Sequence, residues 1–270
     1  MSRDLVRQIV VAVSAVLAVV GGFIGSGAAG GTKIADAAGG ALSADSTPIA
    51  PGGPAFGIWT VIYLGLLSYA VWQLLPAQRD SPRQRRLGYP IAASLLLNAA
   101  WILSVQAGQL WLSVAVIVAL LAVLVYAFLL TLRTRPDDTI EAIVADGTIG
   151  LYLGWVCVAT IANVAAALKD SGFTGGPLSA DTWGAILAAV AGLVGIGLAV
   201  RGGGRLAPTA SLCWGLTWVA VARLTGELES MSTAVAAIIA VVLVLVATAV
   251  FRIVAKAQEA RATPGLTSLN

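Results

Sequence analysis

The chain has 270 residues, of which 59% are hydrophobic and only 11% are charged, and its mean hydropathy is +0.92. Ordinary soluble domains carry about 25% charged residues, so the composition excludes a typical water-soluble fold and indicates an integral membrane protein. The chain contains no histidine, which excludes a Ser-His triad, a histidine-ligated zinc site and a histidine-ligated haem.

Eight apolar runs follow one another, each close to the about 20 residues that carry a helix across a bilayer. They cover residues 8–28, 55–76, 88–107, 110–132, 143–168, 183–200, 207–224 and 231–251. In lipid the backbone must satisfy its own hydrogen bonds, and the alternation typical of a barrel is not visible, so we expect helices. The predicted fold class is therefore all-α, a polytopic integral membrane protein with eight transmembrane helices.

Basic residues are distributed unevenly between the gaps that separate these runs. Of the 16, only Lys33, Lys169 and Arg223 lie in one alternating set of gaps, and all the others lie in the other set. Lys and Arg in short loops stay on the cytoplasmic side, so we expect an inner-membrane protein with both termini in the cytoplasm. The same asymmetry explains the sequence pI of about 9.1 without a nucleic-acid partner.

The first run also resembles a secretory signal, because two arginines precede it and residues 35–37 look like a cleavage site. We favour a retained helix, since the apolar stretch 9–24 is long for a signal and the GxxxG spacing of Gly21 and Gly25 lets another helix approach closely. Cleavage would leave seven spans.

Two connections divide the chain. Residues 29–54 are rich in Gly, Ala, Ser and Pro and are expected to form either a lid over a cavity or a plain surface loop. Residues 169–182 are the predicted linker between a five-helix membrane bundle at 1–168 and a three-helix membrane extension at 183–256. The polar tail 257–270 is expected to be disordered.

Polar and aromatic side chains recur at helical spacing in three of the first five runs. They are Trp59 and Tyr63 in the second run, Asn98 and Trp101 in the third, and Tyr152, Trp155, Ala159 and Asn163 in the fifth. Residues three or four apart share a helix face, and an amide at membrane depth needs a hydrogen-bond partner, so we expect both amides to face the bundle interior. The predicted topology places several of these groups, with Trp111, beneath residues 29–54. An interfacial aromatic belt is equally compatible with Trp59 and Trp111.

Isolated charges and thiols have simpler interpretations. Asp146 lies near the inner end of the fifth run, where a solvated or snorkelling carboxylate is expected. Arg223 and Glu227 are four residues apart, which predicts a local ion pair. Cys157 and Cys213 lie inside apolar runs and are expected to be buried thiols, with a disulfide as the alternative.

Three stretches carry motifs in a fixed order. They are PGGPAFGIWTVIY at residues 51–63, LNAAW at residues 97–101 and YLGWVCVATIAN at residues 152–163. In sequence and in their order along the helices they resemble the TspO/MBR family, the tryptophan-rich sensory proteins whose mitochondrial member is the translocator protein. The resemblance covers about residues 8–168 and leaves the last three helices outside.

The resemblance implies a five-helix bundle whose cavity is closed by the first loop and binds tetrapyrroles such as protoporphyrin. The ligand-binding candidates are Trp59, Tyr63, Asn98, Trp101, Trp111, Tyr152, Trp155, Ala159 and Asn163. Aromatic faces stack on a flat macrocycle and amides meet its propionates, and because neither task needs histidine, a metal-free porphyrin fits better than coordinated haem. No cofactor is required. The family's Trp-Tyr and Lys-Pro elements are missing from the first loop, and Leu151 stands where a proline commonly occurs. No Tyr followed at close range by Lys or Arg ends the fifth helix, so the usual cholesterol pattern is absent there and sterol binding is not expected.

The predicted function is a TspO-type ligand-binding protein that serves sensing or transfer. The expected partners are membrane lipid and a porphyrin-like or other small amphipathic ligand, with a homodimer left open. A secondary transporter of a small organic solute, completed by the last three helices, is an alternative, although charges in the middle of the runs are scarce. A porphyrin-degrading enzyme is another alternative, and it ranks below binding because no acid/base pair is visible.

Overall fold

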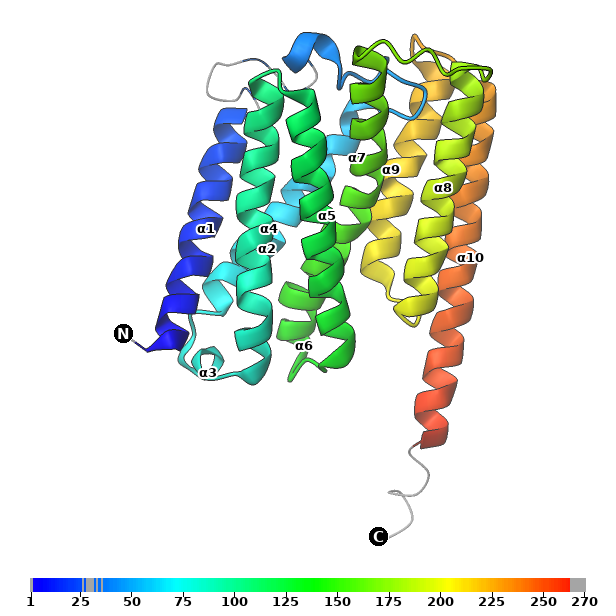
Figure 1. Cartoon of the computed structure of the whole chain (residues 1–270). Helices are drawn as coiled ribbons and strands as arrows, with labels where there is room; N and C mark the ends of the chain where they lie inside the picture. The colour runs from blue at the N-terminus through cyan, green and yellow to red at the C-terminus, as the bar shows by residue number, and fades with distance from the viewer. Residues whose placement is uncertain (1, 26, 28–31, 33, 35, 263–270) are drawn as a thin grey trace.

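The computed structural model describes residues 2–25, 27, 32, 34 and 36–262, and these residues form a bundle of helices without strands (Figure 1). The long helices are α1 (Arg3–Gly25), α2 (Ile58–Trp72), α4 (Pro82–Gln106), α5 (Leu110–Arg133), α7 (Thr148–Asp170), α8 (Ala180–Arg201), α9 (Leu206–Thr225) and α10 (Met231–Ala262). Shorter elements are the 3-10 turns η1 (Ala37–Gly40) and η2 (Gly53–Gly57), the helices α3 (Pro76–Arg79) and α6 (Thr139–Glu141), and a π-helical segment η3 (Ala142–Gly147). Each of the eight predicted spans coincides with one long helix, so the all-α membrane fold is confirmed.

Among the described residues, seven helical segments are long and apolar enough to cross a membrane. The remaining long helix is α9, whose buried face carries Thr209, Ser211 and Arg223. Its position explains these polar groups, because α9 packs against α7, α8 and α10 and so buries them in protein. The chain is therefore a polytopic membrane protein in which α9 is the one long helix, among the described residues, whose composition falls short of a membrane span.

The helices form two groups (Figure 1). The first contains α1, α2, α4, α5 and α7, the second contains α8, α9 and α10, and α9 packs on α7 where the groups meet. Gly154 of α7 permits this contact, since a Cβ there would lie 2.1 Å from the carbonyl oxygen of Pro208. At the other side of the bundle, a Cβ on Gly21 of α1 would lie 3.0 Å from Ala99 Cβ of α4. The close helix approach predicted from the GxxxG spacing is thus confirmed.

Several element boundaries differ from the predicted ones. Helix α4 begins at Pro82 within the basic segment, because the Ser81 side chain caps it by accepting a hydrogen bond from Gln84 N. The fifth predicted span begins at Thr139 and passes through the π-helical segment before α7. Helix α10 continues to Ala262, so the expectation of a disordered tail is wrong for residues 257–262, and residues 263–270 lie outside the described residues.

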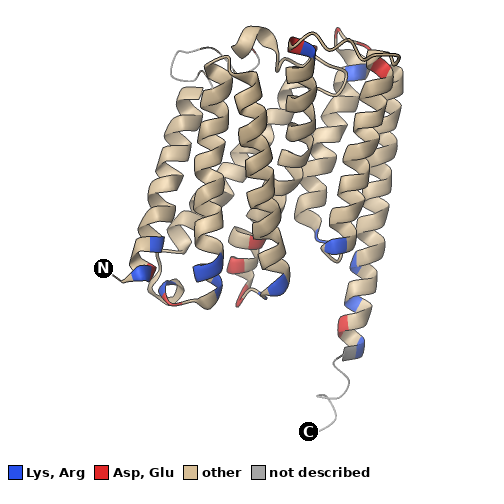
Figure 2. Cartoon of the chain, viewed as in Figure 1, with Lys and Arg blue, Asp and Glu red and all other residues tan. Residues whose placement is uncertain are grey.

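Charged residues collect near the two ends of the bundle and leave the middle of the helices almost free of them (Figure 2). Helix α1 begins and α10 ends at the same end, which we call the basic end (Figure 1). The opposite end is covered by residues 36–57, which we call the lid. The predicted cytoplasmic location of the termini stays a prediction.

Candidate functional site

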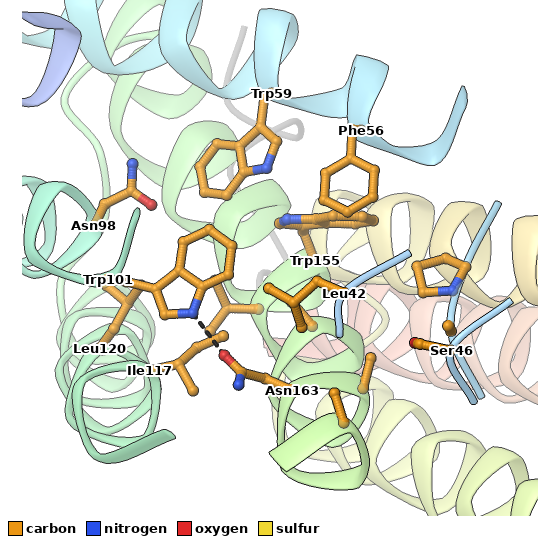
Figure 3. A pocket seen from close by; sticks show the side chains of 16 residues that line it. Leu42, Ser46, Phe56, Trp59, Asn98, Trp101, Ile117, Leu120, Trp155 and Asn163 are labelled. Carbon is orange, nitrogen blue, oxygen red and sulfur yellow. Dashed lines mark hydrogen bonds between the residues drawn. The ribbon is translucent and has the colours of Figure 1, made fainter. Parts of the chain in front are cut away.

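Two neighbouring cavities lie beneath the lid. The small cavity has a volume of about 40 Å³ and is lined from α2, α4, α5, α7 and the lid (Figure 3). The wide cavity has a volume of about 380 Å³ and extends toward Gly22 of α1. The two share the walls formed by Leu42, Pro51, Phe56, Trp59, Asn98 and Trp101. Ligand pockets usually measure about 300–1,000 Å³, so of these two cavities the wide one reaches that range and the small one does not.

Most of the predicted site residues meet at these cavities. Those that line one or both are Trp59, Tyr63, Asn98, Trp101, Trp155, Ala159 and Asn163. They come from α2, α4 and α7, as the helical spacing predicted. Whether they bind a ligand stays a prediction.

Two predicted site residues lie elsewhere. Trp111 is 54% exposed, and its indole N–H donates to Ser171 Oγ at 2.8 Å, so it takes the interfacial position that was its alternative. Tyr152 is fully buried behind Trp59, with ring centroids 5.6 Å apart, and its hydroxyl donates to Ser94 O at 3.3 Å. Tyr152 therefore supports the cavity wall without facing the cavity.

Aromatic rings hold this wall in place. Trp155 meets Phe56 edge to face at 5.6 Å and Trp59 at 6.4 Å between ring centroids. Trp59 also contacts Tyr63, at 5.6 Å. Contacts of this geometry contribute about 0.5–1.5 kcal/mol each beyond area burial. The cluster therefore fixes the orientation of the rings around the cavities before any ligand arrives.

Both amides are buried and paired, as predicted. Asn163 Oδ1 accepts from the Trp101 indole N–H at 2.6 Å, and Asn163 Nδ2 donates to Ser113 Oγ at 3.0 Å. Asn98 Nδ2 donates to the Tyr63 hydroxyl at 2.7 Å. The Asn98 amide oxygen points toward the space between the Trp59 and Trp101 rings (Figure 3). One polar acceptor thus projects between two indole rings of a largely apolar cavity wall.

The sequence analysis missed part of the site. Additional lining residues are Leu42, Ser46, Phe56, Ile117 and Leu120. The lid residues have no helical periodicity to mark them, and the aliphatic residues resemble many others. The sequence did contain a signal for Ser113, because it is a polar residue inside a strongly apolar run. In the structure its side chain is completely buried and bonded to Asn163.

Asp146 and Arg223 have partners from distant segments. The Asp146 side chain is 12% exposed and pairs with Arg83 and, at 3.2 Å, with Arg205. The predicted solvated or snorkelling position is therefore wrong. Arg223 is 1% exposed and pairs with Asp45 at 3.6 Å, so the predicted pair with Glu227 is also wrong. These partners come from other helices and from the lid, which local sequence spacing does not show.

Cysteine and acidic residues add no further site in the described part of the chain. Cys157 and Cys213 are free and buried, which confirms the prediction of thiols. No group of three or more His, Cys, Asp or Glu residues is arranged to hold a metal ion within the described residues. The chemistry that the cavities offer is that of ring faces, indole N–H groups and carboxamides.

The comparison with known families agrees with the motifs and extends them. A family model described as TSPO-like protein matches residues 8–250. The match includes α8, α9 and most of α10, which the motif resemblance over residues 8–168 left outside. No curated protein and no solved structure matches the chain. Because the family model covers most of the sequence, the chain belongs to the TSPO-like protein family.

Proposed function

We propose that this membrane protein binds a tetrapyrrole, or a similar flat amphipathic molecule, in the cavities beneath the lid and serves its sensing or transfer. The observation that carries the proposal is the meeting of Trp59, Trp101 and Trp155 with Asn98 and Asn163 around one hollow, from three different helices. Membrane location and family membership are consistent with this function.

The chemistry of the walls suits such a ligand. The rings of Trp59 and Trp101 line both cavities and offer faces for stacking on a flat macrocycle. Trp101 uses its indole N–H on Asn163, whereas Trp59 and Trp155 donate to no acceptor among the described residues. Those two N–H groups are free to donate to a ligand carboxylate. Because the chain contains no histidine, a metal-free porphyrin is the form that we expect to bind.

Cavity size constrains how the ligand binds. The small cavity, at about 40 Å³, holds little more than water, whereas the wide cavity of about 380 Å³ suits a larger molecule. We therefore expect the macrocycle in the wide cavity, with one edge toward the small cavity. Full insertion requires Leu42 and Phe56 to move, since both line the boundary between the cavities. Binding is thus coupled to the position of the lid.

Titration of the protein in lipid nanodiscs with protoporphyrin tests this function. We expect saturable quenching of tryptophan emission, with affinity also measured from porphyrin fluorescence. The double variant Trp155→Phe, Asn163→Ala removes two polar groups from the cavity wall, each worth about 1 kcal/mol, and is expected to bind about tenfold or more weakly. Trp111→Phe is the matched control and is expected to bind normally, because Trp111 lies outside the cavities. Absence of saturable binding, or equal binding by the double variant, contradicts the proposal.

The alternative functions give different results with the same purified protein. A secondary transporter produces gradient-dependent uptake into proteoliposomes, and an enzyme that degrades porphyrin changes the porphyrin absorption spectrum in light or in darkness. A binding protein gives saturable quenching with an unchanged spectrum and without gradient-driven accumulation.

A further inference from the structure

The lid is attached to α9, a helix of the C-terminal group. The Trp214 indole N–H donates to Ala55 O at 2.9 Å, and the backbone N–H of Gly52 donates to Trp218 O at 3.1 Å. Further along α9, Arg223 donates to Thr47 O at 3.3 Å. Three points along one helix therefore each hold a different point of the lid.

Arg223 is the most unusual of these attachments. Its side chain is 1% exposed, and its guanidinium is bonded to the backbone carbonyls of Ala44 and Thr47. The carboxylate of Asp45 is 3.6 Å away and is 42% exposed, while Arg223 Nε has no partner among the described residues. A buried cation needs acceptors, and here most of them are carbonyl groups of a loop. Lid opening would replace these carbonyls with water at the end of the bundle, so the attachment is reversible.

The composition of α9 fits this role. It is the one long helix in the described residues that is not apolar enough to qualify as a membrane span. Near the end of α9 that faces the lid, the buried and charged residue Arg223 bonds to the lid. A helix that only filled space against α7 and α10 would not need this charge. The departure of α9 from a membrane-span composition therefore has an explanation in the lid.

The same short segment of the lid contacts both α9 and the cavities. Residues Leu42, Ser46, Ala50, Pro51 and Phe56 line the small cavity, and residues Ala44, Thr47, Gly52 and Ala55 bond to α9. Because the two sets interleave along the chain, the lid cannot leave the cavities without breaking bonds to α9. The position of α9 thus helps to set the position of the cavity wall, together with Lys169 of α7, whose ammonium group donates to Ser46 O.

We infer that α9 positions the lid, and that Trp214 and Arg223 control how often the lid opens and hence how fast a ligand enters and leaves the cavities. This inference rests on the proposed function. Both side chains are positioning residues, since neither lines the cavities. The three C-terminal helices then regulate the site that the first five helices form.

Three variants separate the attachment from general damage. Trp214→Phe removes the N–H that bonds to Ala55 O and keeps a ring against Trp218, which is 5.7 Å away between centroids. Arg223→Gln removes the charge, and Arg223→Lys keeps the charge with fewer donors in case the glutamine variant does not fold. Trp183→Phe is the matched control, because Trp183 of α8 donates to Gly175 O at 2.9 Å in a different loop.

Amide hydrogen exchange in the ligand-free protein measures lid opening directly, with the Gly52 amide as the reporter. We expect Gly52 exchange to rise about threefold to tenfold in Trp214→Phe, because this variant loses one neutral hydrogen bond. We expect a rise of about tenfold to a hundredfold in Arg223→Gln, because this variant loses hydrogen bonds from a charged group. Arg223→Lys is expected to fall between the wild type and Arg223→Gln. Trp183→Phe is expected to raise exchange in the loop around Gly175 and to leave Gly52 unchanged. Wild-type exchange at Gly52 in Trp214→Phe and in the two Arg223 variants overturns the inference.

Stopped-flow mixing with protoporphyrin measures the consequence for binding. If the lid is a gate, the association and dissociation rates rise by the same factor in Trp214→Phe and the Kd stays within about threefold of the wild type. Damage to the site would instead raise the dissociation rate alone and weaken binding. Unchanged rates, or a faster dissociation alone, overturn the inference while the proposed function stands. If wild-type protein does not bind protoporphyrin, the proposed function fails, and the exchange at Gly52 still decides whether α9 holds the lid.

Discussion

The two ends of α9 are joined to the rest of the molecule by different kinds of contact. At the basic end, Arg205 donates to Asp146 at 3.2 Å and to Thr131 Oγ1 at 2.9 Å, both on helical segments of the first group. At the lid end, Arg223 is bonded to backbone carbonyls of a loop, including that of Thr47. An arginine near each end of α9 therefore links it to the first group. Arg205 makes this link directly to helical segments, whereas Arg223 makes it through the lid.

This difference indicates which end opens. Breaking a buried ion pair by removing one partner costs about 3–5 kcal/mol, whereas a hydrogen bond from a charged group contributes about 1.5–3 kcal/mol. The basic end also contains Arg83, which pairs with Glu141 at 2.7 Å between side chains that are 6% and 1% exposed. The basic end is thus held closed by charges within helices, and we expect a ligand to approach from the lid end.

The largest expected effect is at the basic end. Arg83→Gln leaves the buried carboxylate of Glu141 without its guanidinium partner, so we expect a loss of about 3–5 kcal/mol in the free energy of unfolding. Denaturant titration in mixed micelles measures this loss. Arg86→Gln is the control, because Arg86 is exposed, and it should change stability by less than about 0.5 kcal/mol. A loss below about 1 kcal/mol for Arg83→Gln would remove the proposed contrast between the ends.

Much of the fold was predictable because lipid imposes a simple rule on composition. Each apolar run forms a long helix in the structure. The wrong predictions concern helix boundaries in polar segments, where hydropathy does not distinguish a helix from a loop. Helix α10 continues through polar residues to Ala262, and α4 begins inside a basic segment at Pro82. Hydropathy reports where the lipid ends, whereas caps and backbone hydrogen bonds determine where a helix ends.

The site was predictable where helical spacing determined which residues share a face. Trp155, Ala159 and Asn163 of α7 all line the small cavity. Trp111 does not, because it lies two residues from the fully buried Ser113 and so faces the opposite side of α5. The ion pairs and the lid contacts were not predictable, since their partners lie far apart in the sequence and meet only when helices pack.

A smaller effect is expected where α9 packs against α7. Gly154→Ala places a Cβ 2.1 Å from Pro208 O and 2.3 Å from Ser211 Oγ, so α9 must shift. Overpacking of this kind costs about 1–3 kcal/mol, and we expect it also to increase Gly52 amide exchange, because the lid follows α9. Gly197→Ala on α8 has open space around the new methyl group and should be neutral or stabilising by up to about 1 kcal/mol. A loss of stability in Gly154→Ala with wild-type Gly52 exchange would mean that α9 does not transmit the shift from α7 to the lid.

The smallest expected effect is at the exposed carboxylate of the lid. Asp45 is 42% exposed and lies 3.6 Å from Arg223, so Asp45→Asn should cost about 0.2–1 kcal/mol at low salt. The cost should vanish near 1 M salt, where the screening length falls to about 3 Å. Glu227→Gln should have no effect, because Glu227 is exposed and Arg223 pairs with Asp45 instead. Unfolding titrations at both salt concentrations measure the difference. A cost that persists in high salt would mean that a desolvated ion pair holds the lid, as ion pairs hold the helices at the basic end. In that case the lid would open no more readily than those helices separate, and the contrast between the two ends would be lost.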